Sequence, residues 1–397
     1  MREPTAFLRG SKAMLPYRAI IVSLDTYTAP FNDGKLKELG RLGVETLAVA
    51  GDVQTLWPVR GTSRREAEYG VEVLPTRFGS SPATTCLVGL RGLLRNYAPN
   101  VVHIEAEPWQ RVAVQACRFA MTSGTLFGVQ FAENGPQLRG AAGAARRRIA
   151  THVLRSCEYV VGWSSESALV ARRLAPGKAV ATFPATGVSS SRLHPSAQPD
   201  RWFSRMNDGG LKLAFAGRLA VEKGVQDVLR VADEVARHTS VRVAVAGSGP
   251  LESLVRSWTA DRPWARFHRV LPRDATQELL GLADVVLCPS RTMPHVKEQF
   301  GKAAVEAMAL GTPVYAYACG ALQEVIGDGG VVVPEGDCDA LISAILAYAN
   351  SSSVKRDELS RRARDRAEQF TDEAIARQLV SIWETQAARG VGDKCGS

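Results

Sequence analysis

The stretch Leu213-Ala-Phe-Ala-Gly-Arg218 opens a second series of strands and helices in this 397-residue chain. Its apolar residues end in a glycine turn, and a helical segment follows Val221-Glu-Lys-Gly224. Strands that alternate with helices in this way are typical of a parallel sheet. Further short apolar strands are expected at 241–246, 266–270, 285–288, 314–316 and 331–333. We therefore predict one doubly wound α/β domain over residues 205–371.

The N-terminal half shows the same alternation. We expect strands at 19–24, 46–50, 71–74, 101–105, 126–131 and 159–163, and helices at 34–42, 85–97, 110–122, 144–156 and 165–174. A linker rich in Pro, Ser, Gly and Asp, 184–210, separates the two series. The fold class is thus α/β, with two tandem Rossmann-like, doubly wound domains that face each other across a cleft. The first covers 1–190 and is joined by a C-terminal helix within 372–397. In such sheets ligands collect at the carboxyl ends of the strands.

The composition favours a cytoplasmic protein. No apolar run approaches the roughly 20 residues that cross a bilayer, and residues 1–16 lack the apolar core of a signal peptide. The seven cysteines are scattered without a Cys-x-x-Cys pair, so neither a disulfide framework nor a zinc site is expected. The abundance of Ala, Arg and Gly suggests a GC-rich bacterial genome.

The positive charge lies in the N-terminal half. Residues 1–200 carry 24 Lys and Arg against 15 Asp and Glu, whereas the remainder carries 25 of each. The excess is concentrated in Arg139, Arg146, Arg147, Arg148, Arg155, Arg172 and Arg173. These residues form either a solvated helix face or a surface that attracts an anion, such as an acidic acceptor or the inner face of a membrane. Nucleic acid is not expected, because the aromatic content is 7% and no stacking motif accompanies the charge.

Two glycine-containing turns follow strands of the second domain. At Gly217-Arg218 and Lys223, an arginine and a lysine five residues apart could grip one diphosphate, or they could be ordinary surface cations. At Gly247-Ser-Gly249, glycines permit a close approach by a ligand or by a neighbouring backbone. The dinucleotide fingerprint is absent, because Glu252 stands where its third glycine would be.

The segment Glu298-Gln-Phe-Gly-Lys-Ala-Ala-Val-Glu306 carries the densest signal. We expect a helix to begin near Phe300 or Gly301 and to end at Gly311, with Glu298 in the preceding loop. The helix N-terminus offers free N–H groups to phosphate. Glu306 lies among apolar residues, where an unpaired carboxylate would be costly, so a ligand-binding role is favoured over a solvated one.

These motifs match in order and spacing those of the family 4 retaining glycosyltransferases, which the chain resembles over residues 17–387. The resemblance implies the two-domain GT-B fold and a nucleoside-diphosphate sugar, UDP- or GDP-linked, as co-substrate, with no cofactor and no metal. Arg218 and Lys223 would hold the diphosphate, Glu298 the transferred sugar and Glu306 the ribose. Backbone groups of Gln299, Phe300, Gly301 and Lys302 would contact sugar or phosphate. The base would lie near Val270–Leu271 and the turn with Gly247 and Gly249, and Gly217 would also contact the donor.

The first domain departs from the family pattern. Thr26 lies where a glycine pair is common, and Glu133 or Asn134 occupies the place of a histidine that would face the transferred sugar. Glu107, after the strand that contains His103, is expected on the acceptor side.

We therefore expect an enzyme that transfers a hexose, with retention, to a small-molecule or lipid acceptor in natural-product or cell-envelope glycoside biosynthesis. Docking on an anionic membrane through the basic first domain is one alternative. A non-catalytic protein that binds a sugar nucleotide is another.

Overall fold

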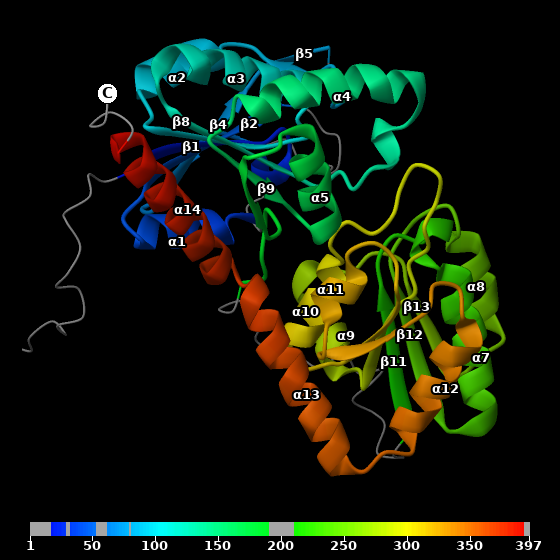
Figure 1. Ribbon diagram of the computed structural model, residues 1–397. Helices are drawn as coiled ribbons and strands as arrows, with labels where there is room; N and C mark the ends of the chain where they lie inside the picture. The colour runs from blue at the N-terminus through cyan, green and yellow to red at the C-terminus, as the bar shows by residue number, and fades with distance from the viewer. Residues whose placement is uncertain (1–16, 29–31, 53–61, 79–80, 190–209, 393–397) are drawn as a thin grey trace, which may run out of the picture.

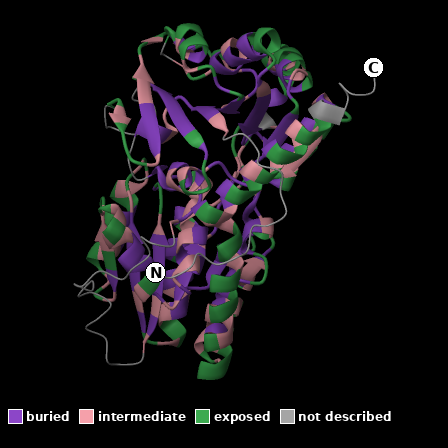
Figure 2. Cartoon of the chain, turned by 90° about the vertical axis from the view of Figure 1, so that its left-hand side faces the viewer, coloured by how far each residue is buried: buried purple, intermediate pink, exposed green. Residues whose placement is uncertain are grey.

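A computed structural model describes residues 17–28, 32–52, 62–78, 81–189 and 210–392 of the chain. Two α/β domains lie one above the other, and two consecutive helices, α13 and α14, run along one side of both (Figure 1). Both sheets are buried between helices whose outer faces are exposed (Figure 2). The two Rossmann-like domains predicted from the sequence are confirmed.

The first domain contains an eight-stranded sheet of order β10-β9-β8-β7-β1-β2-β4-β3, parallel except for β3. Its strands are β1 Arg18–Val22, β2 Glu45–Gly51, β3 Arg64–Arg65, β4 Tyr69–Leu74, β7 Val101–Glu105, β8 Leu126–Phe131, β9 Tyr159–Gly162 and β10 Ala179–Thr182. Its helices are α1 Gly34–Arg41, α2 Leu90–Tyr97, α3 Arg111–Ser123, α4 Gly140–Arg155 and α5 Ser165–Leu174. Helices α2 to α5 pack against one face, whereas α1 and α14 pack against the other.

The second domain contains a six-stranded parallel sheet of order β13-β12-β11-β14-β15-β16. Its strands are β11 Leu211–Ala216, β12 Val241–Ala246, β13 Ala265–His268, β14 Val285–Cys288, β15 Val314–Tyr317 and β16 Gly330–Val333. Its helices are α7 Val225–His238, α8 Glu252–Ala260, α9 Arg273–Leu282, α10 Lys302–Ala309, α11 Leu322–Ile326, α12 Cys338–Ala349 and α13 Ser353–Ala367. Because its strands are buried on both faces, they read in the sequence as continuous apolar runs.

Three segments differ from the sequence-based expectation. The helix expected over 85–97 begins only at Leu90, because β6 Cys86–Leu87 pairs with β5 Thr76–Arg77 in a small antiparallel ribbon. Neither edge strand of the first sheet, β3 or β10, was expected. The tail at 1–16 and linker residues 190–209 lie outside the described residues.

The chain crosses between the domains twice, and the two crossing segments pair with each other. The N–H of Val188 donates to the carbonyl of Phe370 at 3.0 Å, and the N–H of Asp372 donates to the carbonyl of Val188 at 3.1 Å. A Cβ on Gly187 would lie 2.6 Å from the nitrogen of Asp372, so the approach requires glycine. Helix α14 Asp372–Gly392 then returns to the first domain, where Trp383 is fully buried. Within the described residues, no helix is both long and apolar enough to cross a membrane.

Candidate active site

A cavity of about 860 Å³ lies at the carboxyl ends of β11 and β12, beside the start of α10. This is the edge of the sheet at which ligands bind in open α/β folds. The cavity brings together seven residues that the sequence predicted for the donor site: Gly217, Arg218, Gly247, Gly249, Leu271, Lys302 and Glu306. The sequence did not point to three other residues that line it: Arg269, Arg273 and Thr276.

The glycines of the cavity wall have a packing role. A Cβ on Gly247, which has φ +146°, would lie 1.8 Å from the carbonyl oxygen of Gly217. A Cβ on Gly249 would lie 2.5 Å from the carbonyl oxygen of Leu219. Glycine is therefore needed because the two strand-end turns pack directly against each other. The backbone that they expose forms one side of the cavity.

Glu298 is held by two side chains from neighbouring loops. Lys223 Nζ donates to Glu298 Oε2 at 2.6 Å, and Ser290 Oγ donates to the same oxygen at 2.9 Å. Lys223, Glu298 and Gln299 line a smaller cavity of about 140 Å³. Lys223 thus lies with Glu298, whereas Arg218 faces the larger cavity and has a side chain that is 64% exposed. The pairing fixes the Glu298 carboxylate through Oε2 at the wall of the smaller cavity.

Glu306 lies on the second turn of α10, as predicted, and faces the large cavity. Burial raises the pKa of its carboxyl, while Lys302 and Arg273 oppose this shift. Arg273 lies 3.5 Å from Glu306 Oε1. Burial lowers the pKa of Lys302, and Glu306 opposes that shift. These three side chains form a partly desolvated group whose charges can bind both hydroxyl and phosphate groups.

The start of α10 presents backbone donors to the site. Gly301 is the N-cap residue, with φ +84°, and no side chain caps the helix. The first N–H groups of a helix have no partner within it, so they are free for an anion. Phe300 is 6% exposed and packs on Phe370 with ring centroids 5.7 Å apart. Its side chain therefore fixes the loop, and only its backbone can reach a ligand.

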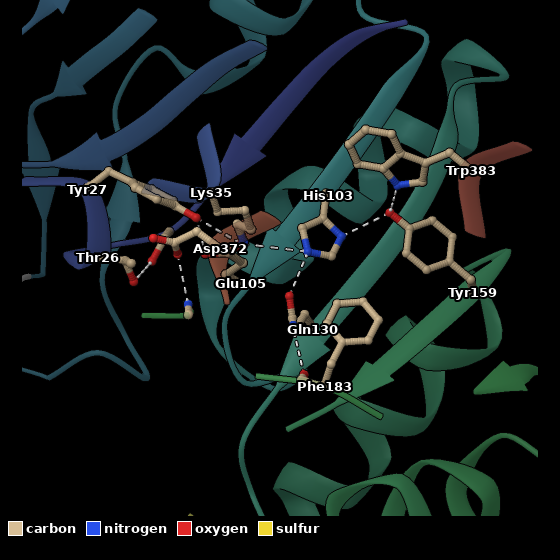
Figure 3. Close-up of polar contacts among 12 residues, drawn as sticks. Thr26, Tyr27, Lys35, His103, Glu105, Gln130, Tyr159, Phe183, Asp372 and Trp383 are labelled. Carbon is tan, nitrogen blue, oxygen red and sulfur yellow. Dashed lines mark hydrogen bonds and ion pairs between the residues drawn. The ribbon is translucent and has the colours of Figure 1, made fainter. Parts of the chain in front are cut away.

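A buried ion pair fixes the loop that follows β1. The ammonium of Lys35, fully buried, bonds to Glu105, and the hydroxyl of Tyr27 donates to the same carboxylate at 2.8 Å (Figure 3). Thr26, next along the loop, accepts a hydrogen bond from Ser23 Oγ at 2.7 Å. The conformation of the loop at Thr26 is therefore fixed by the buried Glu105 group and by a bond within the loop.

The loop after β8 carries both residues that the sequence offers as contacts of the transferred sugar, Glu133 and Asn134. Glu133 is 1% exposed, and its carboxylate accepts hydrogen bonds from the N–H groups of Gly135 and Gln137. Its carboxylate is thus held by two N–H groups of its own loop. Asn134, the other candidate, has an amide nitrogen that is buried without a hydrogen-bond partner among the described residues.

Glu107, two residues after the end of β7, supports the loop that follows β8. Its carboxyl oxygens accept hydrogen bonds from the N–H groups of Ala132 at 3.2 Å and Glu133 at 3.3 Å. Burial, with the Glu133 charge as a second cause, raises the pKa of Glu107 to about 8. Through these two bonds Glu107 holds the loop that carries Asn134.

Among the described residues and apart from the crossing segments, three side-chain contacts join the domains. Lys302 Nζ lies 3.3 Å from Asn32 Oδ1, and Asn32 in turn donates to the carbonyl of Thr26 at 2.8 Å. Lys297 pairs with Glu166 at 2.5 Å, and the N–H of Ser165 donates to Glu324 at 2.8 Å. The donor cavity is thus connected through one side chain to the loop after β1. No group of three or more His, Cys, Asp or Glu side chains gathers as metal ligands in the described part of the chain.

Residues 196–369 match the family described as "Glycosyl transferases group 1". Two relatives are the D-inositol 3-phosphate glycosyltransferase of Corynebacterium kroppenstedtii and the GDP-mannose-dependent alpha-(1-6)-phosphatidylinositol dimannoside mannosyltransferase of Mycobacterium tuberculosis. Each is 33% identical to this chain, over 47% and 46% of its length. The matched region spans 43% and 46% of the respective relatives, less than half of each.

Solved structures show the same fold. The sucrose-phosphate synthase of Thermosynechococcus elongatus superposes with a TM-score of 0.71 at 18% identity, over 94% of this chain and 100% of that one. Anabaena Alr3699/HepE in complex with UDP-glucose gives 0.66 at 14% identity, over 94% and 100%. These similarities show that the two domains are arranged as in the GT-B fold.

Proposed function

We propose that this chain is a glycosyltransferase that transfers a hexose from a nucleoside-diphosphate sugar to an acceptor hydroxyl with retention. The observation that carries the proposal is the cavity at the ends of β11 and β12. It combines Arg218, the free N-terminus of α10 and the Glu306 carboxylate within one site. Cations and N–H groups suit a diphosphate, and a carboxylate suits ribose hydroxyls.

The donor would extend from the large cavity toward Glu298. The base would lie against Leu271 and the turns of Gly247 and Gly249, and the transferred sugar would reach the Glu298 carboxylate. We propose UDP or GDP as the nucleotide. A relative named as GDP-mannose-dependent and a similar structure in complex with UDP-glucose support both.

The proposed chemistry rests on the leaving group. Arg218, Lys223 and the N-terminus of α10 would stabilise the charge that develops on the departing diphosphate, so that no metal ion is required for this task. The Glu298 carboxylate is engaged by Lys223 and Ser290, and that of Glu133 by its own loop. This arrangement supports attack by the acceptor on the face from which the diphosphate leaves.

We propose a small-molecule or lipid acceptor, and therefore a role in natural-product or cell-envelope glycoside biosynthesis in the bacterial cytoplasm or at the inner membrane face. The names of relatives support both acceptor types. One is the phosphatidylinositol dimannoside mannosyltransferase above, and another is the 2-deoxystreptamine N-acetyl-D-glucosaminyltransferase of Streptomyces fradiae, 34% identical over 33% of this chain.

A panel of nucleotides and sugar nucleotides tests the proposal. The matching donor should raise the melting temperature of the wild-type protein, because binding stabilises the folded state. With that donor, Arg218→Ala and Glu298→Ala should each lower kcat/KM by about 100-fold or more, as removal of a group that stabilises developing charge does. Arg230→Ala, which changes an exposed arginine on α7, should leave kcat/KM unchanged.

Near-normal turnover in both Ala variants would refute the proposed site. A wild-type protein that binds a sugar nucleotide but neither transfers nor hydrolyses it would be the non-catalytic binding protein considered as the alternative. The anomeric configuration of the product, read from its NMR coupling constant, decides between retention and inversion.

A further inference from the structure

A second cavity lies between the two domains, apart from the donor cavity. It has a volume of about 680 Å³, and its wall includes Gln137, Arg139, Gly140, Arg146, Pro294 and His295. The first four belong to the start of α4 and the loop before it, and the last two to the loop that precedes α10. Figure 1 shows this second loop rising from the second domain toward the start of α4. No residue lines both this cavity and the donor cavity.

The charged residues that line this cavity are all basic. Two arginines and a histidine line it, and none of its described lining residues is acidic. Arg139 is exposed, and Arg146 donates to the carbonyl of Gln137 at 3.1 Å. Neither arginine forms an ion pair within the part of the chain that the structure describes. The Glu133 carboxylate interacts electrostatically with Arg146, but it is bonded within its own loop and does not line the cavity. The lining itself is basic and attracts an anion.

The floor of the cavity is made by small residues. Gly143 cannot carry a Cβ, which would lie 2.3 Å from the carbonyl carbon of Leu138, so the loop folds tightly onto the first turn of α4. Gly140 has φ +71° and open space beside it. With Gly140, Ala142 and Gly143 in its lining, the cavity has room for a group of about the size of a phosphate. The forked guanidinium donors match the geometry of phosphate oxygens.

The position of the cavity connects it with the reaction. His295 lies three residues before Glu298, and Gln137 lies in the same loop as Asn134, whose amide nitrogen is buried and unpartnered. A molecule seated in the cavity would therefore lie between the loop expected to contact the transferred sugar and the loop that faces it from the first domain. This is where an acceptor must approach.

We propose that this cavity binds a phosphate ester on the acceptor, so that the acceptor of this enzyme is an anion. The inference rests on the proposed function and adds to it the chemical class of the second substrate. Arg139 and Arg146 hold the phosphate, and His295 closes the site from the second domain. The phosphate can be carried by a soluble molecule or by a lipid headgroup, since both present the same oxygens to the arginines.

Inorganic phosphate is the first probe. Its binding is measured by calorimetry at low salt, once with free protein and once with the donor site filled by the nucleoside diphosphate found in the panel. Wild-type protein should bind phosphate in both cases. Arg139→Gln and Arg146→Gln should each weaken this binding by about tenfold or more, since each removes a charge-assisted contact. Arg148→Gln on the same helix lines a different cavity and is the matched control.

Vesicles separate the two sources of phosphate. Binding of the wild-type protein to vesicles of phosphatidylcholine with phosphatidylglycerol, lost in Arg139→Gln and kept in Arg148→Gln, would assign the site to a lipid phosphate. Binding to inorganic phosphate without binding to vesicles would assign it to a soluble one.

Two results would overturn the proposal: phosphate binding that is equal in Arg139→Gln and Arg148→Gln, or none in a wild-type protein that binds nucleotide. Vesicle binding that depends on Arg148 alone would also contradict it. Melting temperatures of the variants show that each is folded. If no nucleotide binds but phosphate binding still depends on Arg139, then the proposed function fails and the anion site stands.

Discussion

At the scale of single residues, Glu105 holds the first domain's loop in place through two partners. Lys35 and Tyr27 both bond to its carboxylate, and all three residues are buried. Burying an ion pair costs desolvation energy that the attraction only partly offsets, so such a pair adds little net stability, yet removing one partner leaves an uncompensated charge. The pair therefore specifies the conformation of the loop that carries Thr26.

Lys35→Met should consequently lower the free energy of unfolding by about 3–5 kcal/mol. The double variant Lys35→Met with Glu105→Gln should recover part of this loss, because a neutral amide remains to accept the hydroxyl of Tyr27. Urea denaturation measures both. The exposed pair Arg230 and Asp339 is the control, and Arg230→Met should cost at most about 1 kcal/mol. A double variant as unstable as Lys35→Met would contradict the charge argument.

At the scale of elements, a chain of hydrogen bonds joins helix α14 to the start of the linker through β7, β8 and β9 (Figure 3). Trp383 Nε1 donates to the hydroxyl of Tyr159 at 2.7 Å, and Gln130 Nε2 donates to the carbonyl of Phe183 at 2.8 Å. Between them lies His103, 2.9 Å from the Tyr159 hydroxyl through Nδ1 and 3.1 Å from Gln130 Oε1 through Nε2.

Only one arrangement of protons satisfies this chain. Because the amide nitrogen of Gln130 faces a carbonyl, its oxygen faces His103, and Nε2 of His103 must carry the proton. Nδ1 then accepts from the hydroxyl of Tyr159. Every group is paired when the histidine is neutral. Burial lowers the pKa of His103 to about 3, and the charge of Lys35 adds to this effect.

Acid should therefore destabilise the protein through His103. The unfolded chain takes up a proton near the ordinary histidine pKa of 6.5, whereas the folded chain does so only near pH 3. Stability from this group is complete above pH 6.5 and is lost as the pH falls toward 3. Between pH 7 and pH 5 the loss amounts to about 2 kcal/mol.

Urea denaturation from pH 7 to pH 5 measures this loss. His103→Gln, although less stable at pH 7, should show a flatter pH dependence, and His152→Gln, an exposed histidine on α4, should follow the wild type. Equal slopes in wild type and His103→Gln would show that His103 does not remain neutral.

Local patterns allowed most elements to be predicted, and non-local contacts explain the exceptions. The central strands, such as β8 and β12, are buried on both faces and appear as uninterrupted apolar runs. The edge strand β10 has only four residues, none of them fully buried, and so left no such run. Residues 85–89 were assigned to a helix because their pairing with β5 depends on residues about ten positions away.

The residues of the candidate site also fall into two groups, those that short motifs predict and those whose contacts the motifs do not reveal. Its second-domain residues follow strands in short motifs, so one parallel sheet brings Gly217, Gly247 and Glu306 together without further information. The inward turn of Glu133 depends on hydrogen bonds within its loop, which residue types alone do not specify. The bond between Lys35 and Glu105 joins residues 70 positions apart, and no local sequence pattern predicts it.

At the scale of the whole molecule, the arrangement of the domains depends on a few polar contacts beside the two crossing segments. The carboxylate of Glu324, from α11, accepts the N–H of Ser165 at the start of α5 with both oxygens, at 2.8 and 3.1 Å. A carboxylate is favoured at this end of a helix, where free N–H groups concentrate partial positive charge. Lys297 and Glu166 form the second contact in the same region.

Glu324→Ala should therefore loosen the domains without unfolding either of them. Because the contact is partly solvent-exposed, its loss should be worth only about 0.5–1 kcal/mol, enough to shift a population but not to unfold a domain. Small-angle scattering without ligand should show a larger radius of gyration for the variant than for the wild type. Glu335→Ala, which removes a carboxylate that bonds only within the second domain, should leave the curve unchanged. A saturating nucleoside diphosphate should not restore the wild-type curve in Glu324→Ala, since the donor cavity is lined by second-domain residues alone. Identical curves for wild type and Glu324→Ala would mean that the crossing segments alone set the domain arrangement.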